Sequence, residues 1–297
     1  MCPRIALVND HRWIAPDHPD DYARRILTED RLLTDAFERR GANVERVAWS
    51  DADIDWPAFD ALVIRQTWDY FERLAGFTAW LDSIEGRVRV VNPVAVLRWN
   101  LHKRYLVELA RAGVPTVPTR LVPAGSGAPL DSAMDALGTD DAVIKPAVSG
   151  AGRETYRVAR AAAASMASTW NRLVAAEDMM IQPFMPAIVA RGEVSLMVMD
   201  GETTHAVRKI AAPGEFRVQD DHGGTVQAHA PAAAETGIAE RAIAAVPGDV
   251  AYARVDLVDS DAGPRVMELE LIEPELFFRH CPEAAERLAA RVLRSSA

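Results

Sequence analysis

The sequence predicts an α/β protein, with an open α/β sheet domain at the N-terminus and an α+β arrangement in the C-terminal part. Short apolar runs alternate with helical patterns through the first hundred residues, which is typical of an open α/β sheet. Two strand-like runs, 253–258 and 265–271, flank a turn-rich segment and indicate an antiparallel hairpin. The 297 residues, 49% of them hydrophobic, are enough for about two domains.

The N-terminal elements follow from the spacing of apolar residues. Strands are predicted at four short apolar runs, 4–8, 44–48, 61–65 and 88–91. A helix is predicted around 32–37, where apolar residues recur at helical spacing and Gly41 follows as a stop signal. A second helix is predicted around 77–84. The stretch 92–100 contains Pro93 and is the predicted boundary, so the first domain covers residues 1–98.

The second domain, 99–297, is predicted to begin with a helix at 103–112 that ends before Gly113. Segment 123–129 is rich in glycine, proline and serine and predicts an exposed loop. The alanine-rich segment 159–167 predicts a surface helix or turn.

Composition excludes several classes of protein. The chain has 43 acidic and 33 basic residues and a net charge of -10, so it offers nucleic acid no general electrostatic attraction. Two distant cysteines provide neither a disulfide framework nor a zinc ligand set. No segment approaches the roughly 20 apolar residues that cross a bilayer, and we expect a cytoplasmic protein without a membrane partner. The first strand is followed by no G-x-G-x-x-G motif, and a Walker A motif is also absent.

Only three of the 33 basic residues are lysine, namely Lys103, Lys145 and Lys209. A compact ammonium group fits phosphate pockets in which a planar guanidinium is too bulky. Lys145 ends a strand-like run and precedes a small-residue loop that contains Gly150 and Gly152, where main-chain N–H groups can approach an anion. This pattern predicts a nucleotide site. The alternative is a glycine-containing hairpin with a solvated lysine.

Three carboxylates are predicted to meet in the C-terminal hairpin. If Asp259 pairs with Arg265, then Asp256 lies opposite Glu268, and Glu268 shares a face of its strand with Glu270. Carboxylates this close repel one another unless a cation neutralises them, and hard oxygen ligands suit Mg²⁺. The alternative is an amphipathic strand with a solvated acidic face.

Together, these motifs resemble the ATP-grasp superfamily in order from about Asn100 to Pro274. The resemblance implies that residues 99–184 form a small lobe with a lid and that 185–297 form a magnesium-binding lobe. It implies that adenine is read by the carbonyl group before Pro183 and the amide after it. The residues that it assigns to ATP are Lys103, Lys145, Ser149, Gly150, Gly152, Gln182, Pro183, Phe184 and Glu193. It assigns Mg²⁺ or Mn²⁺ to Asp256, Glu268 and Glu270.

Within the superfamily, the chain is most similar to bacterial glutathione synthetase. It departs from that enzyme at Glu270, where the glutathione enzyme has asparagine, and at Ser195, where it has a basic residue. Segments 65–70, 100–106 and 268–274 resemble a smaller branch that includes the O-ureido-serine cyclo-ligase of cycloserine biosynthesis.

The resemblance implies an ATP-dependent ligase that activates a small-molecule carboxylate as an acyl phosphate. An amine-type nucleophile then displaces phosphate, in another molecule or by ring closure in the same one. Lys209 and Arg217 are assigned to the γ-phosphate and the developing intermediate. Arg65 lies at the end of a predicted strand and is a candidate clamp for a substrate carboxylate. Trp68 and Tyr70 are candidate pocket residues, although such an aromatic pair also packs domain interfaces.

Two other functions stay open at this stage. One is an amino-acid ligase that acts on a peptide or protein terminus, and the other is an ATP-binding regulator without catalysis. The oligomeric state also stays open, a homo-oligomer included.

Overall fold

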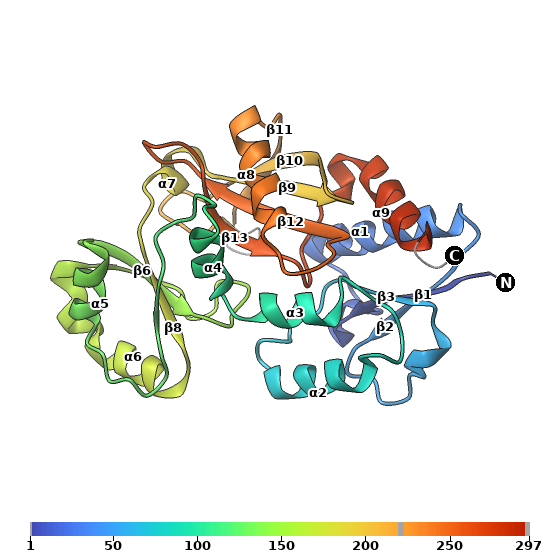
Figure 1. Ribbon diagram of the computed structural model, residues 1–297, viewed down its shortest axis with the longest axis horizontal. Helices are drawn as coiled ribbons and strands as arrows, with labels where there is room; N and C mark the ends of the chain where they lie inside the picture. The colour runs from blue at the N-terminus through green and yellow to red at the C-terminus, as the bar shows by residue number, and fades with distance from the viewer. Residues whose placement is uncertain (1, 219–222, 295–297) are drawn as a thin grey trace.

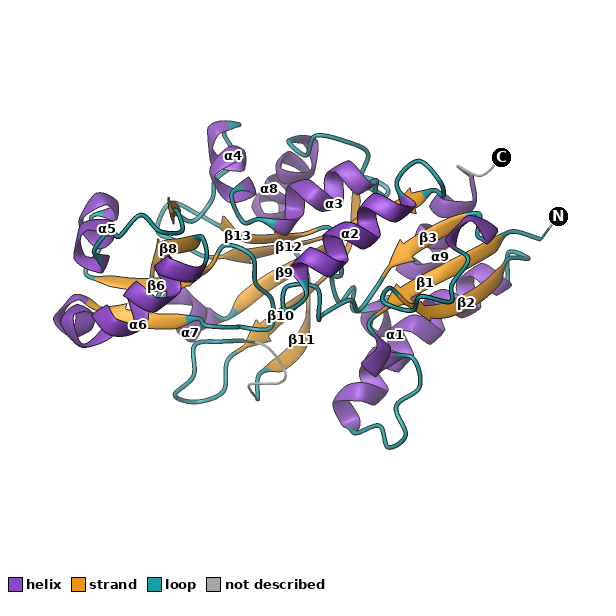
Figure 2. Cartoon of the chain, turned by 90° about the horizontal axis from the view of Figure 1, so that it is seen from below, coloured by secondary structure: helices purple, strands orange, loops and turns teal. Residues whose placement is uncertain are grey.

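The computed structural model describes residues 2–218 and 223–294 and arranges three β-sheets in a row (Figure 1). The sheet at the N-terminus is parallel, and the other two sheets are antiparallel. Figure 2 shows the same row from below, with the helices lying over the faces of the sheets. The predicted α/β class is therefore confirmed. In the described ranges, no helix is long and apolar enough to cross a membrane.

The N-terminal sheet has the strand order β2-β1-β3-β4. Its strands are β1 (Arg4–Asn9), β2 (Asn43–Ala48), β3 (Ala61–Ile64) and β4 (Val90–Val91). Helix α1 (Asp21–Glu38) and helix α2 (Leu74–Ile84) cover opposite faces. Alternation along β1 explains this arrangement, because Ile5 and Leu7 pack with α1, whereas Ala6 and Val8 pack with α2.

Two predictions for this region were incomplete. Helix α1 begins at Asp21 rather than near residue 32, because the side chain of Asp20 accepts the amide of Ala23 at 2.8 Å and caps the helix. Most of the predicted boundary 92–100 is helical, since α3 (Val94–Leu101) begins directly after Pro93.

The central sheet has the strand order β11-β10-β9-β12-β13. Its strands are β9 (Glu193–Met199), β10 (Glu202–Ile210), β11 (Thr225–His229), β12 (Tyr252–Val258) and β13 (Arg265–Glu270). Helix α4 (Tyr105–Arg111) and helix α8 (Ala233–Ala244) share an apolar core with β9, β12 and β13.

The hairpin of β12 and β13 does not have the predicted register. Arg265 pairs with Val258 rather than with Asp259, but an irregularity between Asp256 and Leu257 leaves Met267 without a partner and shifts the ladder by one residue. Asp256 therefore lies opposite Glu268, as predicted.

The third sheet has the strand order β5-β8-β6-β7 and lies within the predicted small lobe. Its strands are β5 (Arg120–Val122), β6 (Asp141–Pro146), β7 (Tyr156–Ala159) and β8 (Met179–Pro183). Helix α5 (Leu130–Leu137) and helix α6 (Ala163–Ala176) cover it, and the short helix α7 (Ala187–Arg191) follows it. Segment 123–129 is an exposed loop, as predicted. The helix or turn predicted at 159–167 is confirmed for 160–167, which form a short 3-10 helix and the start of α6, whereas Ala159 is the last residue of β7.

The C-terminal helix α9 (Pro282–Arg294) returns to the N-terminal part of the fold (Figure 1). It packs against α1, and Leu288 shares a core with Phe37 of α1 and Met197 of β9. The N-terminal sheet and the central sheet therefore share one apolar core, which holds the two sheets close together.

Candidate active site

A cavity opens between the third sheet and the central sheet, and most of the predicted site residues line it. They come from the turn before α4, from β6 and the loop after it, from β8, β9 and β13, and from the loop after β10. The predicted residues on its walls are Lys103, Lys145, Ser149, Gly150, Gly152, Gln182, Pro183, Phe184, Glu193, Arg217, Glu268 and Glu270. We call this space the first cavity.

One end of the first cavity is apolar. Val117, Val143, Met185 and Met267 line it, and the ring of Phe184 packs edge-to-face on Phe216 with centroids 6.1 Å apart. A flat apolar slot of this kind suits a purine base. The amide of Phe184 donates to the carbonyl oxygen of Asp141 at 2.8 Å. This amide, which was expected to bind adenine, is therefore already used in a hydrogen bond of the sheet.

The amide that follows, that of Met185, donates to no acceptor within the described residues. A main-chain amide free to bind a ligand therefore lies one residue farther along the chain than expected. The physical reason is that β8 stays hydrogen-bonded to β6 as far as Phe184, so a main-chain donor becomes available only beyond it.

The other end of the first cavity holds two ammonium groups around one carboxylate. Lys103 donates from Nζ to Glu268 at 2.6 Å, and Nζ of Lys145 lies 3.5 Å from the same carboxylate. Burial opposes ionisation of Glu268, but the two ammonium groups outweigh it and hold its pKa far below the usual range. Lys103 also donates to the carbonyl oxygen of Ser149 at 2.9 Å and so fixes the start of the glycine loop.

Two glycines of the site are required by close packing. A Cβ atom on Gly150 would lie 2.6 Å from the ring of Phe71. Phe71 belongs to the N-terminal domain, so this domain contacts the glycine loop at Gly150. Gly192 has a φ of +79°, and a Cβ there would overlap the carbonyl oxygen of Lys209. Gly192 therefore lets β9 begin close to β10 and places Glu193 beside Lys209.

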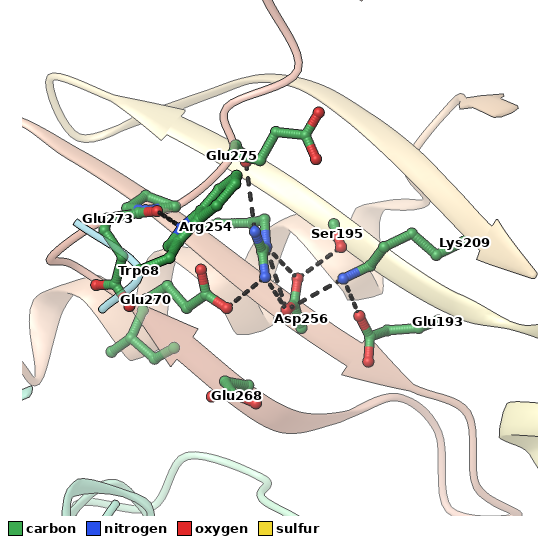
Figure 3. A network of polar contacts seen from close by, with 12 residues as sticks. Trp68, Glu193, Ser195, Lys209, Arg254, Asp256, Glu268, Glu270, Glu273 and Glu275 are labelled. Atoms are coloured by element: carbon green, nitrogen blue, oxygen red, sulfur yellow. Dashed lines mark hydrogen bonds and ion pairs between the residues drawn. The ribbon is translucent and has the colours of Figure 1, made fainter. Parts of the chain in front are cut away.

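Behind these groups lies a buried network of charges on β9, β10, β12 and β13 (Figure 3). The guanidinium of Arg254 donates to both oxygens of Asp256, with bonds of 2.9 Å from Nε and from Nη2, and also binds Glu270. Lys209 pairs with Glu193, and its Nζ lies 3.4 Å from Asp256. The hydroxyl of Ser195 donates to Asp256 at 2.5 Å.

Burial sets the protonation of this network. It raises the pKa of Glu193 to about 7 despite the ammonium of Lys209, and it raises the pKa of Glu270 to about 7 despite Arg254. Burial also opposes the charge on Asp256, but Arg254 and Lys209 outweigh it and lower the pKa of this carboxyl. Two carboxylates that titrate near neutral pH therefore flank one that stays ionised.

The three carboxylates assigned to magnesium do not share one open space. In the ranges 2–218 and 223–294, no group of three acidic, histidine or cysteine side chains is arranged to hold a metal ion. Glu268 and Glu270 both line the first cavity, and their oxygens suit a hard cation. Asp256 lies behind them, where Arg254, Lys209 and Ser195 contact its oxygens. The residues thus fit a cation held mainly by Glu268 and Glu270.

A second cavity of about 290 Å³ adjoins the first and shares Gly150, Ala151 and Glu270 with it. Lys209 and Trp68, two of the predicted site residues, line this second cavity. The structure places Arg65 and Tyr70 elsewhere. Both are buried and lie outside the lining of either cavity as described.

Arg65 is fully buried beneath the second cavity. Its Nη1 donates to the carbonyl oxygen of Pro274 at 3.4 Å, and its Nε lies 3.5 Å from Asp30. Tyr70 packs with Phe71 and Phe77 in the core below α2. The loop after β13 lies against Arg65, so Arg65 does not open onto either cavity.

Sequence reasoning missed Arg254, which lines the second cavity and contacts two of the predicted metal ligands. It also missed Trp13, Tyr22 and Glu273 of the same cavity. The signal for Arg254 was its position two residues before Asp256 on one strand, where the two side chains share a face.

Comparison with known proteins supports both halves of this description. The family model for the N-terminal domain of D-cycloserine synthetase DcsG matches residues 5–92. The model for the ATP-grasp domain of prokaryotic glutathione synthetase matches residues 130–260. The cycloserine biosynthesis protein DcsG of Streptomyces lavendulae is 33% identical over 307 residues, which is 96% of this chain and 96% of that protein.

Solved structures agree. The crystal structure of D-cycloserine synthetase DcsG has a TM-score of 0.87 and 29% identity, and the match covers 99% of this chain and 100% of that chain. D-alanine–D-alanine ligase from Bacillus anthracis has the same fold, with a TM-score of 0.70 at 14% identity, 99% of this chain and 97% of that chain being covered.

The lysine-lined cavity between two antiparallel sheets is that of an ATP-grasp ligase, an enzyme that forms a carbon–nitrogen bond. Within that class, the chain belongs to the family of D-cycloserine synthetase DcsG. Both resemblances inferred from the motifs, to the superfamily and to the cycloserine branch, are therefore confirmed.

Proposed function

We propose that the protein activates the carboxylate of a small molecule as an acyl phosphate and closes a ring by attack of a nitrogen in the same molecule. O-ureido-D-serine is the proposed substrate, and D-cycloserine is the proposed product. The observation that carries this proposal is the second cavity, which adjoins the first at Gly150 and Glu270 and has Arg254 on its wall. A carboxylate bound there can approach the γ-phosphate of an ATP molecule whose α- and β-phosphates lie at Lys103 and Lys145.

In the first step, a substrate carboxylate oxygen attacks the γ-phosphorus of ATP, and ADP leaves. Lys103 and Lys145 would exchange Glu268 for phosphate oxygens, and Arg217 would reach the γ-phosphate from the loop after β10. Glu193 would hold the ribose. A divalent cation at Glu268 and Glu270 would neutralise phosphate charge in this step.

In the second step, the ureido nitrogen bonded to oxygen attacks the acyl carbon, loses its proton and expels phosphate. Arg254 is placed to stabilise the oxyanion that forms, because its Nη1 has one long contact, 3.5 Å to the carbonyl oxygen of Glu275, while its other nitrogens are held by carboxylates. Lys209 contributes a second positive charge on the same wall. The ring nitrogen still carries a carbamoyl group that cycloserine lacks, so water must remove this group as carbon dioxide and ammonia.

The test is ADP release from Mg-ATP with O-ureido-D-serine, with the product identified by mass spectrometry. Hydroxylamine added during turnover should trap an acyl phosphate as a hydroxamate. Glu268→Gln should abolish ADP release, whereas Glu240→Gln, on the exposed face of α8, should not change it. Equal turnover in the Glu268 variant would contradict the site assignment.

The same assay separates the other functions. ADP release that requires a peptide together with a free amino acid would replace ring closure by ligation at a peptide terminus. Binding of ATP without ADP release under any of these conditions would identify an ATP-binding protein without catalysis.

A further inference from the structure

The second cavity has a charge pattern that its own residues do not balance. Its basic side chains already have partners, since Arg12 binds Asp10, Lys209 binds Glu193, and Arg254 binds Asp256 and Glu270. Some of the acidic side chains that line this cavity have no basic partner among the described residues. Glu270 pairs with Arg254 and Glu275 pairs with Arg279, which leaves Glu72 and Glu273. Glu72 is exposed to solvent, whereas Glu273 is buried.

Glu273 is 8% exposed and lines the second cavity. Within residues 2–218 and 223–294, no basic side chain lies within ion-pair distance of it, and Lys103 attracts its charge only from farther away. Burial and the neighbouring Glu270 raise its pKa well above the usual value. A buried carboxylate without a cation is costly, and a bound cation is what relieves the cost.

The loop that carries Glu273 is held rigidly from both sides. Trp68 donates from Nε1 to the carbonyl oxygen of Glu273 at 2.9 Å, and Arg65 donates to that of Pro274. Figure 3 shows Trp68, Glu270, Glu273 and Arg254 gathered at one end of the buried network, with Glu193 and Lys209 at the other. The main chain that carries Glu273 is therefore held in place before any ligand binds, which reduces the entropy cost of binding.

An aromatic wall faces the same space. The rings of Trp13, Tyr22 and Trp68 contact one another, with centroid distances of 5.7 Å for the two tryptophans and 6.3 Å for Tyr22 and Trp68. Aromatic faces attract ammonium groups, and they exclude water from a charge that is bound beside them. A carboxylate beside an aromatic wall is a pattern suited to a primary ammonium group.

We propose that Glu273 binds an ammonium group of the substrate, so that the second cavity selects α-amino acids over simple carboxylic acids. The ammonium lies against Glu273 and the aromatic wall, while the carboxylate of the same molecule lies at Arg254. This inference rests on the proposed function for the orientation of the carboxylate. It also explains selectivity, because an α-amine that stays protonated at Glu273 is not a nucleophile and does not compete for the acyl phosphate.

The experiment compares two substrates in two proteins. O-ureido-D-serine and its analogue without the amino group, 3-(ureidooxy)propanoate, are assayed for ADP release with the wild type and with Glu273→Gln. For the amino acid, kcat/KM should fall on the order of tenfold to 100-fold, the range expected for one charge-assisted hydrogen bond. For the analogue, the two proteins should be equally active. Glu240→Gln is the matched control and should change neither value.

An equal loss for both substrates, or no loss for either, would overturn the assignment of Glu273. The thermal midpoint of Glu273→Gln verifies folding, and it should not fall, because burial raises the pKa of Glu273 and a neutral amide can take the place of a protonated carboxyl group. If the wild type releases no ADP with O-ureido-D-serine, the proposed function fails, and the role of Glu273 is then decided by calorimetric titration. D-alanine, L-alanine, D-serine and propionate are titrated in the presence of ADP and Mg²⁺. Binding of an amino acid that Glu273→Gln weakens supports the proposal, and amino acids that bind no better than propionate refute it.

Discussion

Replacing Asn92 by alanine should destabilise the protein strongly, because this buried side chain fastens the N-terminal sheet to the central sheet. Asn92 directly follows β4 and is fully buried. Its amide group donates to the carbonyl oxygens of Tyr252 at 2.9 Å and Leu271 at 2.8 Å, and its oxygen accepts the amide of Ala251 at 2.7 Å. Three buried hydrogen bonds at about 1 to 1.5 kcal/mol each give a loss of about 3 to 5 kcal/mol.

For a chain of this size, a loss of that magnitude lowers the thermal midpoint by about 5 to 8 °C. Differential scanning calorimetry of the wild type and the variant measures it directly. Asn171→Ala makes the same chemical change at an exposed position of α6 and should shift stability by less than about 0.5 kcal/mol. If the Asn92 variant behaved like this control, the two sheets would not depend on the Asn92 hydrogen bonds, and the reasoning would be refuted.

Three further predictions follow from the site and its supports. Arg254→Lys loses the fork that binds Asp256 and Glu270, and should lower kcat on the order of 100-fold with a much smaller effect on the KM for ATP. Gly150→Ala should raise the KM for ATP through its clash with Phe71, and adding Phe71→Ala should restore it; an unrestored double variant would contradict the packing argument. Burial raises the pKa of Glu29 from 4.5 to about 7, so the stability contribution of Glu29 is full below the unfolded pKa and is lost as pH rises through 7. Thermal melts from pH 5 to 8 should therefore show a fall in the wild type that is smaller in Glu29→Gln, by roughly 3 kcal/mol.

The C-terminal hairpin shows which part of a site can be predicted from sequence. Side-chain alternation correctly put Glu268 and Glu270 on one face, because the period of a strand is fixed by its backbone. The exact register was not predicted, because the irregularity that leaves Met267 without a partner inserts one extra residue into the ladder, and side-chain alternation alone does not locate such a bulge. The opposition of Asp256 and Glu268 was predicted because that irregularity happened to offset a one-residue error at the turn.

Arg65 shows where prediction fails for a physical reason. Ligands commonly bind at the carboxyl ends of parallel strands, and Arg65 does follow β3 at that edge. In this fold, however, the loop after β13 lies over the edge, and the guanidinium binds the carbonyl oxygen of Pro274. Which sheet edge is covered by a distant segment depends on the packing of whole domains, and no local pattern around Arg65 contains that information.

The proportions of lysine and arginine in the chain explain why the lysines of the site were predicted and why Arg254 was missed. All three lysines line one of the two cavities, so a residue type that the chain otherwise avoids marked the site. The same bias hides functional arginines, because Arg254 is one of 30. Charge balance identifies it where composition does not. All seven residues of β12 are buried, so Asp256 needs a cation on its own face, and the basic side chain two residues before it on the strand is Arg254. The rule extends to Glu273, a buried carboxyl group that no basic side chain of the described residues approaches within ion-pair distance, and for which we propose the substrate ammonium as the partner.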